Sequence, residues 1–237
     1  MSHLDSQADQ ASSLWANNPV LVNLLGISPV LALSDRSSTA LAIGLCILLV
    51  GICSSVSVFG LRGKLDVNLR YPAYALIMAF YTSLLALVME LNFYPLWREL
   101  GIYLYLVAAN FALLLKMDVY YQAEKAVWVL KDASRLCLGF LEAILLLALI
   151  RETLMTGTVF SDWHILLPGS ESLDPMLRQQ QGELFRFADL PPAVFILLGL
   201  LIAALRQAGL LGAPRFESRN KDTVKRERVT GRLKRKS

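Results

Sequence analysis

The stretch NPVLVNLLGISPVLAL, residues 18–33, is apolar and begins as a helix does, because Asn18 is a favoured N-cap residue and Pro19 suits the first helical position. Its roughly fourteen apolar residues would reach about 20 Å at about 1.5 Å each, whereas the hydrocarbon core of a bilayer is about 30 Å thick. Gly26 and Pro29 interrupt the stretch, and a proline inside a helix removes a backbone hydrogen bond. A short, interrupted apolar segment is typical of a site at mid-membrane depth, and a buried or interfacial helix without a site is the alternative.

The composition around this stretch is that of a protein that crosses the membrane several times. Of the 237 residues, 55% are hydrophobic and 18% are charged, and the mean hydropathy is +0.50. Soluble domains contain about 45–50% apolar residues by a similar count. We therefore expect an all-α membrane protein. The sequence shows no nucleophile triad, phosphate-binding glycine loop or dinucleotide-binding pattern.

Six apolar segments are expected, at about residues 18–33, 38–61, 72–91, 100–115, 133–150 and 190–206. The second segment carries no charge and is long enough to span a bilayer. The fourth segment is short, like the first, and Asn110 lies inside it. With three segments in each half, the second half must lie upside down relative to the first. The sequence therefore predicts an inverted repeat with a site where the two interrupted segments meet.

Basic residues indicate the orientation. The loop 62–70 is basic, and the tail from residue 215 onward holds ten Lys or Arg against three acids. Because cytoplasmic loops are enriched in Lys and Arg, we expect both termini in the cytoplasm and the protein in the bacterial inner membrane. The predicted organisation is an N-terminal segment 1–17, a membrane domain 18–208 with a periplasmic loop at about 153–189, and a tail 209–237. The tail could also bind nucleic acid, but we favour the orientation signal.

Charged residues in and beside the fifth segment are candidates for an ion path. Lys131, Arg135 and Glu142 follow a spacing that puts them on one stripe of a helix, and Asp132 is close enough to Arg135 in sequence to pair with it. Glu142 lies ten residues from Asp132 and from Glu152, which is about 15 Å from each end of the span. An acid at this depth suggests function, and a glutamate that only fixes helix packing is the alternative.

Three stretches resemble the E subunit of the Rnf ion-translocating ferredoxin:NAD oxidoreductase, which is itself similar to the D subunit of the sodium-pumping NADH:quinone reductase. They are LWANNPVLVNLLGISPVLAL (14–33), IRETLMTGTVF (150–160) and LPPAVFILLGL (190–200), and the resemblance extends over about residues 14–208. Ile150 stands where the family has Leu. The resemblance implies a membrane component of a complex that couples electron transfer between ferredoxin and NAD to ion movement, without catalysis by this chain alone.

The resemblance also implies partners and a role for one acid. Other subunits would carry flavins and iron–sulfur clusters, and a homologous membrane protein of opposite orientation would pair with this one in the lipid bilayer. No nucleic-acid partner is expected. The family has an acid where Asp132 stands, which implies a role in ion passage there.

A further implication concerns an iron–sulfur cluster. In the family, the two homologous membrane proteins hold a [2Fe–2S] cluster with two cysteines from each, and those that correspond to this chain stand in LLGxCP and xTNC. The matching strings here are LLGISP (24–29) and AANF (108–111), so Ser28 and Phe111 occupy the ligand positions. Because such clusters are held by cysteine thiolates, we expect this chain to bind no stable cluster in this way and no metal by itself. We expect Phe111 to have become packed core.

The three cysteines, Cys46, Cys53 and Cys137, lie in apolar segments without a CxxC motif. Packed intramembrane cysteines are the favoured explanation, and a displaced cluster is the alternative. Two other functions also stay open beside the coupling role. One is a redox-silent structural or assembly component of a related complex, and the other is a stand-alone inverted-repeat carrier.

Overall fold

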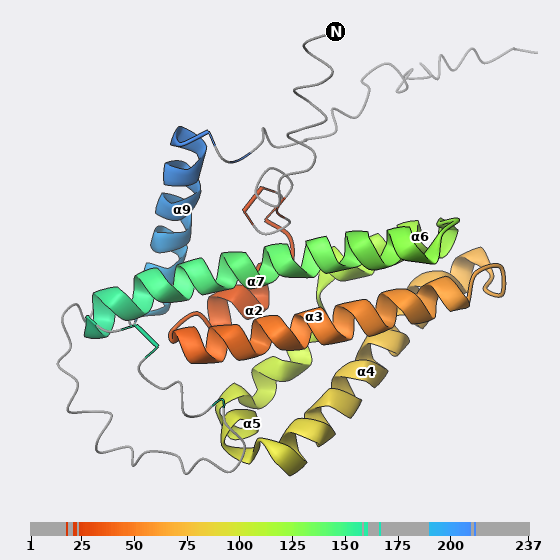
Figure 1. Cartoon of the computed structure of the whole chain (residues 1–237), viewed down its shortest axis with the longest axis horizontal. Helices are drawn as coiled ribbons and strands as arrows, with labels where there is room; N and C mark the ends of the chain where they lie inside the picture. The colour runs from red at the N-terminus through yellow and green to blue at the C-terminus, as the bar shows by residue number, and fades with distance from the viewer. Residues whose placement is uncertain are drawn as a thin grey trace, which may run out of the picture.

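The computed structural model describes residues 18, 21–22, 24–157, 159–160, 166, 190–209 and 211 (Figure 1). Within these residues it contains only helices, which confirms the predicted all-α membrane fold. The helices are α2 (Ile27–Ala32), α3 (Ser37–Gly60), η1 (Val67–Leu69), α4 (Arg70–Asn92), α5 (Tyr94–Leu100), η2 (Gly101–Val107), α6 (Phe111–Gln122), α7 (Ala126–Thr156) and α9 (Pro191–Gln207).

Among the described helices, three are long and apolar enough to cross a membrane: α3 with 24 residues, Val67–Asn92 with 26, and α7 with 31. A further crossing forms if Tyr94–Val107 and Phe111–Gln122 count as one span, and these two parts are bent by 49°. α9 is a shorter apolar helix of 17 residues, and α2 has only six. The first and fourth predicted segments are therefore short and broken, as expected.

Helices α3 and α7 lie side by side and run in opposite directions at the centre of the fold (Figure 1). Glycines on α3 allow the close approach, as is usual between membrane helices. A Cβ at Gly44 would collide with Leu141, and one at Gly51 would lie 2.5 Å from Cys137 Sγ. α4 packs against α3 and α9 contacts α7, so each half of the chain supplies one central and one outer helix. The symmetry of an inverted repeat stays a prediction.

Two parts of the chain are more helical than the sequence predicted. The fifth span was expected at 133–150, but α7 begins at Ala126 and ends at Thr156, because charged side chains end an apolar run without breaking a helix. It ends where Gly157 adopts a left-handed conformation and donates its N–H to the Thr153 carbonyl. Similarly, the fourth segment was expected to end at about residue 115, but α6 continues to Gln122 and includes Lys116 and Asp118.

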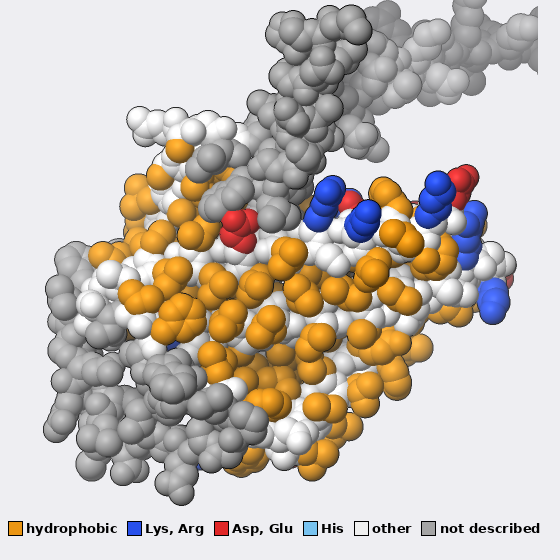
Figure 2. All heavy atoms as spheres, viewed as in Figure 1, with side chains coloured by type: hydrophobic (Ala, Val, Ile, Leu, Met, Phe, Trp, Pro, Cys, Tyr) orange, Lys and Arg blue, Asp and Glu red, His pale blue; other side chains and the backbone are white. Residues whose placement is uncertain are grey.

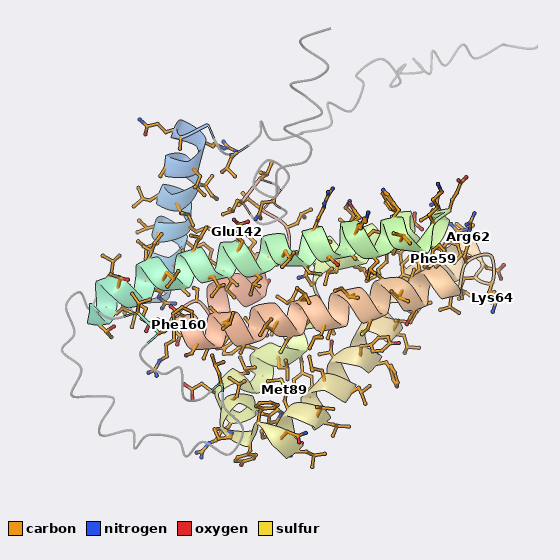
Figure 3. The ribbon with its side chains drawn as sticks, in the orientation of Figure 1. Phe59, Arg62, Lys64, Met89, Glu142 and Phe160 are labelled. Atoms are coloured by element: carbon orange, nitrogen blue, oxygen red, sulfur yellow. The ribbon has the colours of Figure 1, made fainter. Side chains whose placement is uncertain are left out.

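Hydrophobic side chains cover most of the face seen in Figure 2, and basic side chains gather at one end of it. Arg62 and Lys64 lie at this end, just beyond the last turn of α3 (Figure 3). Tyr121 of α6 reaches the loop between α3 and α4 at this end, where it donates its hydroxyl to the Leu65 carbonyl at 3.2 Å.

Candidate functional site

The two interrupted segments meet at the middle of α7. Asn18 donates its Nδ2 hydrogen to the Gly139 carbonyl at 2.7 Å, which ties the first segment to α7. Gly26 has a φ of +68°, and a Cβ there would collide with Asn110 of the fourth segment and lie 2.9 Å from Phe140. Only glycine fits this conformation and this space without strain. The structure thus places Gly26, Asn110 and Phe140 in one junction.

The side-chain oxygens of the two asparagines accept hydrogen bonds from backbone N–H groups two or three residues further on. Asn18 Oδ1 accepts a hydrogen bond from the Leu21 N–H at 3.1 Å, and Asn110 Oδ1 accepts from the Ala112 N–H at the same distance. Asn110 is the N-cap of α6, and such a side-chain cap satisfies backbone donors that a helix start leaves free. However, the Nδ2 of Asn110 is buried and has no partner among the described residues. The junction therefore contains one donor that no described group uses.

Ser28 and Phe111 lie beside this junction, two residues after Gly26 and one after Asn110, and both are exposed. The ring of Phe111 is 65% exposed, so the expectation that Phe111 had become packed core is wrong. α6 presents it at its first position together with Leu115 and Val119, which follow at intervals of four residues and are also exposed. These three side chains form an apolar stripe on the outer surface of the chain, which we call the α6 stripe.

Asp132 lies near the start of α7 and pairs with α6. Its Oδ2 accepts hydrogen bonds from Lys116 Nζ and from the Tyr120 hydroxyl, both at 3.0 Å. Lys116 and Tyr120 are one helical turn apart and so share the face of α6 that meets Asp132. Arg135 is exposed, and the pair predicted between it and Asp132 is not the pair that the described residues form. The chain turns back between α6 and α7, which brings a closer cation to Asp132.

A second aspartate at the same end was missed by the sequence analysis. Asp118 accepts hydrogen bonds from the Tyr74 hydroxyl at 3.3 Å and from Gln122 at 3.0 Å, and Arg70 lies 3.8 Å away. The Arg70 guanidinium also lies over the Tyr121 ring, 4.6 Å from its centroid. The available signal was the polar content of residues 116–121, which hold one lysine, one acid and two tyrosines and suit a helix between two polar neighbours better than a loop.

Glu142 lies ten residues beyond Asp132, at mid-helix, and Figure 3 shows it on the side of α7 turned away from α3. The residue is half-buried, and its Oε2 is buried with no partner among the described residues. The structure therefore does not bring Glu142 together with Asp132 and Arg135 in one site. It leaves Glu142 as a separate carboxyl at the middle of α7, on the side turned away from α3.

The opposite end of the α3–α7 pair holds buried charges. Glu152 of α7 is 2% exposed and accepts the Ser37 N–H at the start of α3, at 2.8 Å. Arg151 of α7 is also buried, and it lies near Asp35 in the loop between α2 and α3. Burial raises the pKa of the Asp35 carboxyl above its usual value, while the positive charges of Arg151 and Arg36 lower it in part.

Comparison with known proteins assigns the chain to a family. The family model described as "Rnf-Nqr subunit, membrane protein" matches residues 9–202. The chain belongs to the Rnf-Nqr family. It is similar to proteins named as the E subunit of the ion-translocating oxidoreductase complex in three bacteria. The relative in Pseudomonas aeruginosa is 36% identical over 206 residues, which is 86% of this chain and 85% of the relative.

The other two relatives extend this likeness. The one in Cellvibrio japonicus is 34% identical over 205 residues, which is 86% of each chain. The one in Vibrio atlanticus is 31% identical over 219 residues, which is 92% of this chain and 95% of the relative. The likeness thus covers most of each protein, and the family match over residues 9–202 includes the two interrupted segments.

The residues at the junction of this Rnf-Nqr protein do not fit an iron–sulfur cluster. Ser28 offers a hydroxyl in place of a thiolate, and Phe111 has no ligand atom. The cysteines have other surroundings: Cys46 donates its thiol hydrogen to Met89 Sδ at 3.6 Å, Cys137 is buried against Gly51, and Cys53 is exposed on α3. Among the described residues, no three His, Cys, Asp or Glu side chains come together as a metal site.

Proposed function

We propose that this chain is a membrane component of an Rnf-type complex that couples electron transfer between ferredoxin and NAD to ion translocation. The observation that carries the proposal is the meeting of two interrupted segments on α7, in a chain of the Rnf-Nqr family. Interrupted helices that meet at mid-membrane depth are the usual place of an ion or substrate site in transport proteins. The chain performs no catalysis alone, and its partners carry the flavins and the iron–sulfur clusters.

The proposed orientation places the protein in a bacterial inner membrane, with the end that holds Arg62, Lys64 and Asp132 on the cytoplasmic side. Both termini lie on that side too. This orientation is supported by the basic loop 61–66, with Arg62 and Lys64, which lies at the same end of the α3–α7 pair as Lys116 and Lys125. Lys and Arg are enriched in cytoplasmic loops. A reporter fused after Ser237 tests this orientation, because an active periplasmic reporter at that point would contradict it.

The proposed partner at the α6 stripe is the homologous membrane protein of opposite orientation. The support is the exposed ring of Phe111, next to a junction with an unused buried donor on Asn110. A large apolar surface beside polar, interrupted backbone suits a protein neighbour, since lipid cannot satisfy the polar groups of such backbone.

The proposed ion path begins at Asp132 and passes Glu142. Solvent reaches Asp132 at this end of the molecule, since 29% of its side chain is exposed. Its ion pair is with a single lysine, Lys116. Glu142 supplies a carboxyl at mid-span, where acids face protein interiors or water-filled routes. Arg135 lies between the two in sequence and is exposed on the same helix.

A second candidate is a redox-silent structural or assembly component of such a complex, and Phe111 favours it over a redox-active one. Purification of the complex through a tag on this chain, with iron quantitation and ferredoxin-dependent NAD reduction, separates the candidates. A complex that needs this chain for assembly but transfers electrons equally well with any residue at 28 and 111 supports the structural role. A complex that assembles and couples normally without the chain contradicts both candidates.

The double variant Ser28→Cys with Phe111→Cys tests the ligand positions. It should gain iron only if the partner offers its own two cysteines, because two thiolates alone leave the irons under-coordinated. Iron in the wild-type pair that persists after Cys46, Cys53 and Cys137 are replaced would overturn the proposal that this chain binds no cluster. The single variant Phe111→Cys is the matched control.

A further inference from the structure

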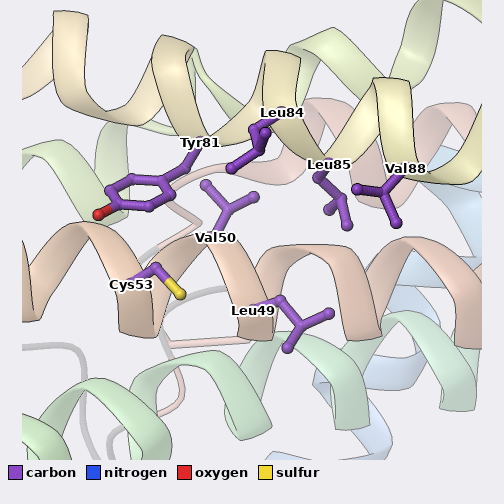
Figure 4. A pocket seen from close by; sticks show the side chains of 7 residues that line it. All are labelled: Leu49, Val50, Cys53, Tyr81, Leu84, Leu85 and Val88. Atoms are coloured by element: carbon purple, nitrogen blue, oxygen red, sulfur yellow. The ribbon is translucent and has the colours of Figure 1, made fainter.

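An apolar groove lies between α3 and α4, away from the junction described above (Figure 4). Its volume is about 150 Å³. Leu49, Val50 and Cys53 line it from α3, and the side chains from α4 include Tyr81, Leu85 and Val88. Because its lining is apolar, the groove favours an apolar occupant over water.

The few polar groups at the groove are already satisfied. The Tyr81 hydroxyl and Ser57 Oγ lie 2.7 Å apart, within hydrogen-bond distance. The Ser57 hydroxyl lies also 2.9 Å from the Cys53 carbonyl. Because these groups need no further partner, an occupant without polar atoms leaves none of them unpaired. The groove therefore suits hydrocarbon and not a polar head or a hydrated ion.

The position of the groove places it in the hydrocarbon layer. Leu49 is twelve residues into α3, which is about 18 Å from the first residue of that 24-residue helix. Both α3 and Val67–Asn92 are long and apolar enough to span a membrane. The groove thus opens between two helices that are long and apolar enough to span a membrane.

The side chains around the groove suit lipid better than a protein neighbour. Helix interfaces within membranes are enriched in small and polar residues. On α3 the small residues Gly44 and Gly51 point to α7. Apart from Cys53, the exposed residues beside the groove are large and aliphatic. They are Leu45, Leu49, Val56, Leu84, Leu87 and Val88.

We infer that the α3–α4 groove binds one acyl chain of a membrane lipid. The acyl chain packs along Leu49 and Leu85 and ends before the Ser57–Tyr81 pair. The inference does not depend on the proposed redox or ion-transport role. It also assigns the two sides of the protein, with lipid on the α3–α4 side and a protein partner at the α6 stripe.

Photocrosslinking tests the inference on the full chain in vesicles of phosphatidylethanolamine and phosphatidylglycerol, with a diazirine on the acyl chain of a tracer lipid. We expect adducts at residues 49–53 and 81–88. The variant Leu84→Trp fills the groove and should reduce adducts at 49–53 several-fold. Leu76→Trp, also on α4 but outside the groove, is the matched control and should leave them unchanged. Adducts on other exposed residues with none in the groove would overturn the inference.

A nitroxide on Cys53 gives an independent measurement, because Cys46 and Cys137 are buried and Cys53 is exposed. Frequent collisions with oxygen and rare collisions with a water-soluble nickel complex are expected for a lipid-filled surface. A protein neighbour would make both rare, and water would make the nickel collisions frequent, so either result would contradict acyl-chain binding. Cys53→Ser shows how much signal comes from this position.

Discussion

The two ends of the α3–α7 pair both carry acids and bases, but these side chains differ in burial and in the groups that they contact. At the end with Glu152, the carboxylate is 2% exposed and accepts a backbone N–H of α3. The neighbouring Arg151 is 5% exposed. The hydroxyls of Ser34, Ser37 and Ser38 are buried there as well, with no partner among the described residues.

At the other end, the carboxylates meet side chains and not backbone. Asp132 and Asp118 each have 29% of the side chain exposed, and their cations Lys116 and Arg70 have 40% and 24%. A tyrosine hydroxyl donates to each aspartate. These pairs can open and close without disturbing a helix.

The difference separates structural charges from exchangeable ones. A buried carboxylate that satisfies a helix start is difficult to replace, because its loss leaves a backbone donor without an acceptor in a dry place. A partly exposed ion pair contributes little to stability, since water and salt screen it. The difference supports the proposed entry of an ion at the end with Asp132.

The largest expected effect is therefore at the buried end. Glu152→Ala should lower the free energy of unfolding by about 2–3 kcal/mol, because the Ser37 N–H loses a charged acceptor. The measurement is unfolding of the purified chain in mild detergent by increasing SDS. Glu90→Ala is the matched control, since Glu90 is an exposed acid on α4 and should change stability by less than about 0.5 kcal/mol. Equal effects of the two variants would remove the distinction between the ends.

At the accessible end, Asp132→Asn should act on transport before stability. Asparagine keeps the size and one acceptor oxygen but removes the charge that an entering cation would meet. We expect ion uptake to fall by about tenfold, which corresponds to about 1.4 kcal/mol in the barrier. Ion uptake by proteoliposomes during electron transfer measures it. Asp118→Asn is the neighbouring control, and a loss equal in both variants would point to the whole end and not to Asp132.

A smaller effect is expected from the partner of Asp132. Lys116→Met removes an ammonium that is 40% exposed, so the free energy of unfolding should change by at most about 1 kcal/mol. Without this tethered cation, an external ion meets less competition at Asp132, and half-maximal uptake should need a lower ion concentration. Lys116→Arg retains the charge and should behave as wild type. An unchanged half-saturating concentration in Lys116→Met would show that Lys116 does not compete with the ion.

The sequence predicted the parts of this structure that depend on local pattern. The second span was expected at 38–61 and α3 runs from Ser37 to Gly60, because an uncharged apolar run of this length has few alternatives. Gly26 and Asn110 marked the two interruptions, and both determine the observed backbone there. These features need only neighbours in sequence.

The parts that were missed depend on contacts between distant residues. The Glu152 bond to Ser37 spans 115 positions, and the Tyr74 bond to Asp118 spans 44. No periodicity in a single segment encodes such pairs. Phe111 was misjudged for a related reason, since its residue type indicates burial but only the packing of α6 decides which side it faces.

Glu142 belongs to neither end, and its variant gives the last and smallest expected change in stability. Glu142→Gln keeps the shape and removes the charge. Because Oε2 has no partner among the described residues, the variant should change the free energy of unfolding by less than about 0.5 kcal/mol. If Glu142 lies on the ion path, however, fewer ions should move per electron transferred, since a carboxyl at mid-span is the only acid of α7 between Asp132 and Glu152. The ratio of ion uptake to NAD reduction in proteoliposomes measures this, and Ser134→Ala on the same helix serves as the control. A normal ratio in a complex that assembles normally would assign Glu142 to packing and leave Asp132 as the single acid of α7 that an entering ion meets.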